Sequence, residues 1–174
     1  MTYADVLELN RRQPRRNAFA ADERRPAEAG KTTPMTGAAS FLAYLGAAPL
    51  LAAALAMVAN PADAGAEAFI TLYGATLLVF FGGVRWGVAV MKPTGPTMRA
   101  LLGAALPMLA ALPLFAPGDP QTKMLAIMAL MIVLLFDDLQ ATRRGDGAPA
   151  WYLGVRMPLT VLIEVALLVA LTAA

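Results

Sequence analysis

Two ionisable side chains stand inside long apolar segments, where such groups are costly to insert and often functional. Arg85 lies six positions before its apolar segment ends at Met91, and Glu164 lies seven positions after Met157. At 1.5 Å per helical residue, both Cα atoms would lie roughly 9–10 Å from the same membrane boundary. Opposite charges at matched depth predict an intramembrane ion pair between Arg85 and Glu164. The pair would be structural or would serve transport.

Arg85 also has a simpler interpretation. A long arginine side chain can extend towards the lipid headgroups while its stem stays in the apolar layer. In that case its guanidinium would meet Asp137 or Asp138, which stand near the end of another apolar segment.

The adjacent acids Asp137 and Asp138 resemble the start of a magnesium-binding motif, because carboxylates are the side chains that Mg²⁺ prefers. The prenyltransferase type of motif needs a further acid where this chain has Ala141. We therefore interpret the two acids as part of a water-facing polar cluster at the inner membrane face, and we assign no catalytic residue, cofactor or metal site. The cluster comprises Asp137, Asp138, Arg143, Arg144 and Arg156.

Small and aromatic residues near these charges predict packing and anchoring roles. Glycines allow helix backbones to approach closely in membranes, and tryptophan and tyrosine favour the membrane–water interface. The predicted close-packing residues are Gly82, Gly83 and Gly87. The predicted interfacial anchors are Trp86, Trp151 and Tyr152.

Composition excludes several classes of function. The 174 residues are 59% hydrophobic and 15% charged, whereas soluble domains carry roughly 25% charged residues. The chain has no cysteine and no histidine, so it lacks a thiolate, a disulfide and a Ser–His pair. A net charge of +2 without a base-reading motif argues against nucleic-acid binding.

Five apolar segments must position these residues, and each is about as long as the roughly 20 residues that a helix needs to cross a bilayer. We predict an all-α membrane protein, a bundle of five transmembrane helices within residues 38–174. The predicted spans are residues 38–59, 66–91, 99–116, 120–139 and 157–173. Asp119 and Pro120 have the residue types of a helix N-cap and first turn, and Pro158 would open the fifth span.

The first 37 residues differ in kind, because they are rich in arginine and interrupted by proline. Such a segment buries too little apolar surface to fold, so we predict a disordered basic tail over 1–37. If the tail, the loop after span two and the loop after span four share one side, that side holds 12 of the 14 lysines and arginines. The positive-inside rule then predicts a cytoplasmic N-terminus and a periplasmic C-terminus in a bacterial inner membrane.

Three stretches carry a family resemblance: residues 44–49, residues 73–75 with 80–87, and residues 149–152 with 156–160. Together they resemble a bacterial and mitochondrial family of small multi-pass membrane proteins that includes animal transmembrane protein sixty-nine. The Gly-Gly-x-x-Trp-Gly core at 82–87 is the most specific of them. The resemblance implies a five-helix membrane fold without an assigned activity.

These observations favour a non-enzymatic accessory, assembly or scaffold protein that contacts the lipid bilayer, anionic lipids and other membrane proteins. Two alternatives remain open. The first is a small transporter or channel that uses Arg85 and Glu164. The second is an inner-leaflet lipid-modifying enzyme that uses Asp137 and Asp138.

Overall fold

The computed structural model describes residues 34–92, 95–145 and 147–174, with side chains described from Gly37 onward. The described residues belong to one compact unit, Pro34–Ala174. The predicted disordered tail, residues 1–37, ends too late, because residues 34–37 already form the start of the first helix. Residues 1–33 lie outside the described residues, and their disorder stays a prediction.

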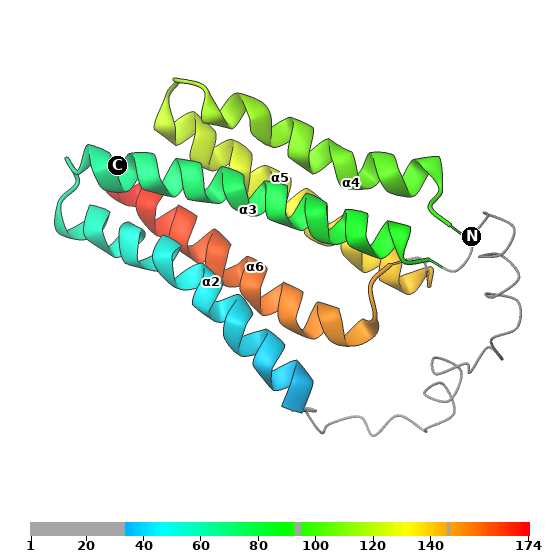
Figure 1. Ribbon diagram of the computed structural model, residues 1–174. Helices are drawn as coiled ribbons and strands as arrows, with labels where there is room; N and C mark the ends of the chain where they lie inside the picture. The colour runs from blue at the N-terminus through cyan, green and yellow to red at the C-terminus, as the bar shows by residue number, and fades with distance from the viewer. Residues whose placement is uncertain (1–33, 93–94, 146) are drawn as a thin grey trace, which may run out of the picture. The chain divides into compact units, whose positions relative to one another are not determined.

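The described chain forms five helices of spanning length, as predicted (Figure 1). Each is long and apolar enough to cross a membrane, the third only when its 3-10 extension is included. Their bounds are α2 Pro34–Ala59, α3 Ala64–Val90, α4 Met98–Ala111 with the 3-10 helix η1 Leu112–Phe115, α5 Pro120–Arg143 and α6 Ala150–Ala173.

Side-chain caps fix where α3 and α5 begin. Asp63 accepts hydrogen bonds from the backbone N–H groups of Gly65 and Ala66, each at 3.0 Å, at the start of α3. The predicted cap of α5 is confirmed, because Asp119 accepts from the Thr122 N–H at 2.7 Å. These acceptors satisfy N–H groups that have no partner inside the helix.

The packing centres on α3, which lies against α4 on one side and against α2 and α5 on others, while α6 packs on α2 and α5 (Figure 1). The interior is apolar and includes the fully buried Leu50, Ile70, Leu78, Ile127 and Ile163. A hydrogen bond also joins α3 to α2, since the Tyr73 hydroxyl donates to the Gly46 carbonyl at 2.6 Å.

Large apolar side chains also cover the outside of the bundle. Leu55, Leu106, Val133, Phe136 and Val161 are each more than half exposed, and they lie on four helices, α2, α4, α5 and α6. A soluble monomer rarely exposes so much contiguous apolar surface. The helix lengths and this outer surface together identify an integral, multi-pass membrane protein.

The fifth span begins earlier than predicted. The sequence suggested a loop over 140–156 and a helix opened by Pro158, whereas α5 continues to Arg143, α6 begins at Ala150 and Pro158 lies inside α6. The connection can be short because Gly145 has a positive φ of 73°. At Gly147 a Cβ would lie 2.6 Å from the Thr142 nitrogen. Only glycine allows this tight turn.

The third span, predicted over residues 99–116, is not one continuous α-helix. It changes to 3-10 geometry at Leu112, one residue before Pro113. Proline has no N–H to donate, and its ring conflicts with the carbonyl four residues earlier, so an α-helix is disfavoured there. By contrast, α2 continues through Pro49 as a single helix.

Candidate functional site: a charged network between four helices

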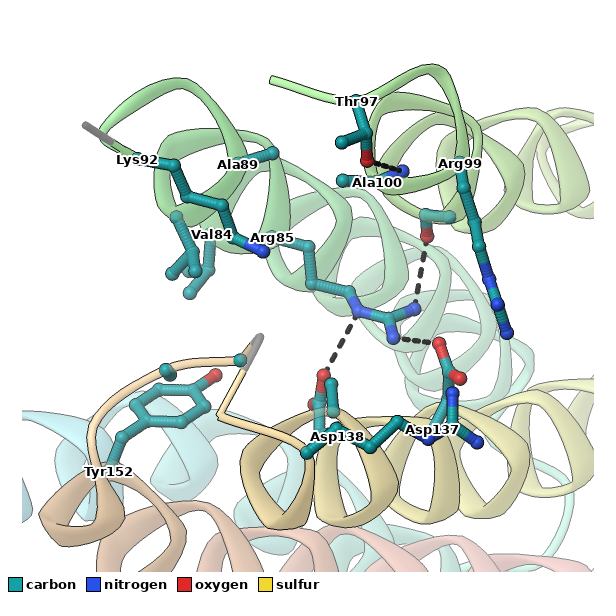
Figure 2. Close-up of a pocket in the computed structure, with 16 residues that line it drawn as sticks. Val84, Arg85, Ala89, Lys92, Thr97, Arg99, Ala100, Asp137, Asp138 and Tyr152 are labelled. Atoms are coloured by element: carbon teal, nitrogen blue, oxygen red, sulfur yellow. Dashed lines mark hydrogen bonds and ion pairs between the residues drawn. The ribbon is translucent and has the colours of Figure 1, made fainter. Parts of the chain in front are cut away.

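Arg85 is the centre of the site, and it reaches from α3 to two other helices (Figure 2). Its Nε lies 2.9 Å from Oδ1 of Asp138, and its Nη2 pairs with Oδ2 of Asp137, both on α5. Its Nη1 donates to the carbonyl of Gly103 on α4 at 3.0 Å. One guanidinium therefore uses its planar fork to tie α3, α4 and α5 together.

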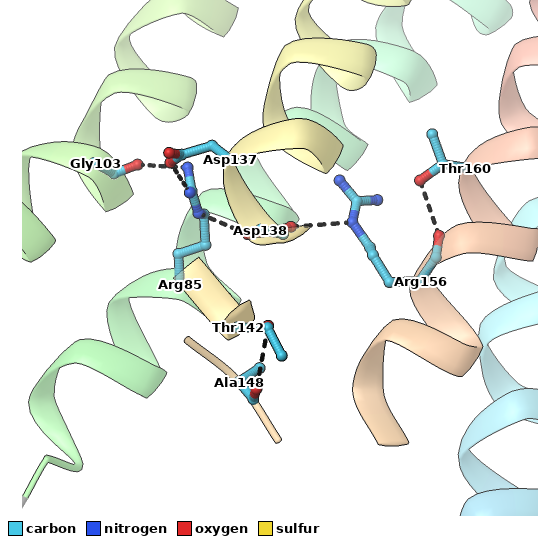
Figure 3. A network of polar contacts seen from close by, with 8 residues as sticks. All are labelled: Arg85, Gly103, Asp137, Asp138, Thr142, Ala148, Arg156 and Thr160. Carbon is cyan, nitrogen blue, oxygen red and sulfur yellow. Dashed lines mark hydrogen bonds and ion pairs between the residues drawn. The ribbon is translucent and has the colours of Figure 1, made fainter. Parts of the chain in front are cut away.

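Asp138 extends this network to α6 (Figure 3). Its second oxygen, Oδ2, lies 3.4 Å from Nε of Arg156. The Asp138 side chain is 12% exposed, that of Asp137 is 54% exposed, and that of Arg156 is fully buried. Asp138 is thus the shared, enclosed acid between two arginines, and Asp137 is the outer acid.

Arg156 also lies against an aromatic ring. Its guanidinium carbon lies 3.3 Å from the centroid of the Phe81 ring on α3, a cation–π contact. Its terminal nitrogens, Nη1 and Nη2, are buried without a hydrogen-bond partner among the described residues. This leaves a buried charge with unused donors.

The predicted pair between Arg85 and Glu164 does not form. Arg85 contacts the two aspartates instead, and both carboxylate oxygens of Glu164 are buried without a partner in the part of the chain described. The depth argument failed because α6 begins at Ala150. Glu164 lies 14 residues into α6, roughly 21 Å along its axis, whereas Arg85 lies roughly 8 Å from the end of α3.

The predicted inner-face cluster is only partly assembled. Asp137, Asp138 and Arg156 join the Arg85 network, but Arg143 is exposed at the end of α5. Arg144 is also exposed and donates to the Gln140 side chain at 2.7 Å. The sequence placed Arg156 in a loop, and its burial within α6 was missed.

The three predicted close-packing glycines behave differently. A Cβ on Gly82 would lie 2.7 Å from Met108 Cγ and 2.9 Å from the Ala104 carbonyl, so α3 and α4 touch there. A Cβ on Gly83 or Gly87 would meet no described atom within 4 Å. Gly82 therefore packs closely against α4, whereas close packing at Gly83 and Gly87, which face outward, stays a prediction.

The predicted aromatic anchors lie at the same end of the bundle as the network. Trp86 stands four residues before the end of α3, and Trp151 and Tyr152 stand in the first turn of α6. Trp86 and Trp151 are about half exposed, and Trp151 meets Tyr152 edge to face at 6.3 Å between centroids. Their position at a membrane interface stays a prediction.

A small pocket of about 260 Å³ opens beside the network. Asp137 and Asp138 line it together with Arg85, Arg99 and Arg144 (Figure 2). The described residues contain no group of three His, Cys, Asp or Glu side chains placed to hold a metal ion. Since both aspartates are bound by arginines, what the arrangement visibly does is join helices.

Five spanning helices with short connections and an enclosed arginine–aspartate network define a multi-pass α-helical membrane protein. The chain belongs to the family described as "Protein of unknown function (DUF3429)", whose model matches residues 35–172. This confirms the resemblance noted in the sequence.

One curated relative is Transmembrane protein 69 of Xenopus tropicalis, which is 33% identical over 129 residues. The aligned region covers 71% of this chain and 49% of that protein, so the chain spans about half the length of this relative. No solved structure matches the chain.

Proposed function

We propose that this protein is a non-enzymatic accessory, assembly or scaffold protein of a membrane complex in the bacterial inner membrane. The observation that carries the proposal is an open face of α3. Gly83 and Gly87 lie there one turn apart, between the exposed side chains of Phe80 and Val90, and no described helix covers them. Small residues one turn apart let a second helix approach closely in a bilayer.

The charged network supports the same proposal. Arg85, Asp138 and Arg156 are engaged with one another across α3, α5 and α6. Charges in a membrane interior are tolerated when they are paired, and here the pairing is between helices. This favours a structural role for the two aspartates over a role in a lipid-modifying enzyme. The transport alternative relied on a pair with Glu164 that does not form.

The direct test is purification of the full chain from its native membrane in mild detergent after cross-linking. We expect a larger complex of fixed stoichiometry, and we expect Gly83→Leu to release it by blocking the open face. Gly154→Leu is the matched control, because Gly154 is also an exposed helical glycine whose added Cβ meets no described atom within 4 Å. A single monodisperse species from the wild type, or equal loss in both variants, would contradict the proposal.

We also propose that the network end of the bundle faces the cytoplasm. Lys92, Arg99, Arg143 and Arg144 stand at this end, and Lys123 stands near the opposite end. Basic residues are retained on the cytoplasmic side, where they also meet anionic lipids. A phosphatase reporter fused after Ala174 should be active in the periplasm, and a fluorescent reporter at the same site should be dark. The reverse result would overturn this orientation.

A further inference from the structure

We propose that a cavity between α2, α3 and α6 binds a single-chain amphiphile with a carboxylate head group, which Arg156 holds through its two terminal nitrogens. The inference goes beyond the accessory role above and does not depend on it. It starts from the buried donors of Arg156, which no described group uses.

Arg156 lines the cavity, its side chain has no exposed surface, and its Nε contact with Asp138 is long at 3.4 Å. In Figure 3 the Nε of Arg156 faces Asp138, while its two terminal nitrogens make no drawn contact. Charge-assisted bonds of this kind are normally 2.7–2.9 Å long, so Asp138 only weakly satisfies the guanidinium.

The rest of the cavity is apolar. Its volume is about 460 Å³, and its lining includes Leu42 from α2, Phe80 and Phe81 from α3, and Trp151 and Leu159 from α6. Leu42, Phe80 and Trp151 are each at least half exposed. They form a rim on the outer surface of the bundle, through which an acyl chain can enter from the bilayer.

The head group follows from the shape of the free donors. Two parallel N–H groups on one guanidinium match the two oxygens of a carboxylate, and such a pair forms two bonds at once. Arg156 lies six residues after Ala150, roughly 9 Å along α6, which is a depth that a fatty acid head group can reach.

The volume favours one chain over two. The cavity volume of about 460 Å³ lies in the lower part of the range of small-molecule pockets, about 300–1,000 Å³. One long acyl chain fits this space, whereas the two chains of a phospholipid do not. The proposed class of ligand is therefore a long-chain fatty acid.

The fluorescence of Trp151 provides a direct assay. The chain has two tryptophans, and Trp151 lines the cavity whereas Trp86 does not. In full-length Trp86→Phe protein, placed in nanodiscs of zwitterionic lipid at pH 8, a dibrominated stearic acid should quench Trp151 saturably. The methyl ester of the same acid should bind at least about tenfold more weakly, because it lacks the anionic head.

Two variants test the two halves of the site. Arg156→Lys keeps the charge but loses the planar fork, so we expect at least about tenfold weaker binding. Gly46→Leu should abolish saturable quenching, because Gly46 lines the cavity and a Cβ added there meets no described atom within 4 Å. Gly154→Leu, an open glycine outside the cavity lining, should bind as the parent does.

Three results would overturn the proposal. Quenching that rises without saturation, or that persists in Gly46→Leu, would mean that the acid acts from the bulk bilayer. Equal binding of the acid and its methyl ester would show that Arg156 does not recognise the head group. If a single-chain phosphate amphiphile competes more tightly than stearic acid, the site prefers a phosphate head group to a carboxylate. The Gly46→Leu result counts even if Arg156→Lys fails to fold.

Discussion

The two ends of the bundle are held together by different forces. At one end, where α3 and α5 finish and α4 and α6 begin, Arg85, Asp138 and Arg156 join helices through charge. We call this the network end. At the opposite end the interior is apolar, and Met57, Ile70, Met124 and Leu167 are fully or almost fully buried there.

This difference indicates which contacts determine the neighbours of each helix in a small membrane bundle. Apolar side chains gain little from leaving lipid, so their packing is a weak guide to which helix lies beside which. A charged group in a membrane is costly until it finds its partner, so each ion pair admits few arrangements. The network end thus specifies neighbours, whereas the opposite end supplies close contact.

Removing the shared acid should break the network end and produce the largest effect. Asp138→Ala leaves Arg85 with one carboxylate and Arg156 with none among the described residues. Breaking a buried pair typically costs about 3–5 kcal/mol, because the remaining charge stays enclosed. We expect a large fall in the thermal unfolding midpoint of the purified protein in detergent.

Asp137→Ala is the matched control for that variant. Asp137 pairs with the same arginine but is 54% exposed, and exposed ion pairs contribute about 0–1 kcal/mol. Equal destabilisation by the two variants would show that enclosure does not distinguish the two acids.

Gly82→Ala and Gly83→Ala form a second pair that separates helix contact from helix propensity. An added methyl on Gly82 meets Met108 and the Ala104 backbone, and overpacking of this kind costs about 1–3 kcal/mol. The same methyl on Gly83 meets no described atom, and alanine is the better helix former by about 1 kcal/mol. Unfolding midpoints should therefore move in opposite directions, and a common direction would refute the contact.

The overall architecture was predictable because it depends on lengths and local chemistry. The five apolar segments and the cap at Asp119 are both visible in the sequence. A bilayer requires each span to satisfy its own backbone hydrogen bonds, so an apolar segment of sufficient length can only be a helix.

The partners of the charged residues were harder to predict. Depth along a helix was taken from assumed helix ends, and the error at Ala150 misplaced Glu164 and put Arg156 in a loop. The contacts with the Gly103 carbonyl and the Phe81 ring depend on how helices turn towards one another. The rotation of each helix about its axis cannot be predicted from a single sequence. One signal for Arg156 was present, because it follows Tyr152-Leu153-Gly154-Val155, a mostly apolar run typical of a helix interior.

A neutral hydrogen bond between helices should have a smaller effect than the charged network. Tyr73→Phe removes the donor to the Gly46 carbonyl, a bond of 2.6 Å between α3 and α2. The expected loss is about 0.5–1.5 kcal/mol, seen as a modest fall in the unfolding midpoint. Tyr44→Phe, at an exposed position on α2, should leave the midpoint unchanged. A Tyr73→Phe effect as large as that of Asp138→Ala would contradict the contrast between charged and neutral contacts.

The smallest expected effect is an acid-dependent one at the opposite end, where a local cap contributes. Hydrogen bonds from the Thr122 hydroxyl and then from the Thr122 backbone N–H lower the pKa of Asp119 below its ordinary value. A carboxyl with a lowered folded-state pKa stabilises the fold above its unfolded pKa of about 3.9, and this contribution is lost as pH falls through the folded pKa.

Asp119→Asn keeps an oxygen acceptor at the cap but cannot ionise, so it isolates this charge. Its unfolding midpoint should lie slightly below that of the parent at pH 7. The gap should shrink as the pH is lowered through about 4 towards 3, because the parent then loses its charge too. If the gap stays constant over this range, the contribution of Asp119 comes from the shape of its cap, and the opposite end depends on charge even less than its apolar core indicates.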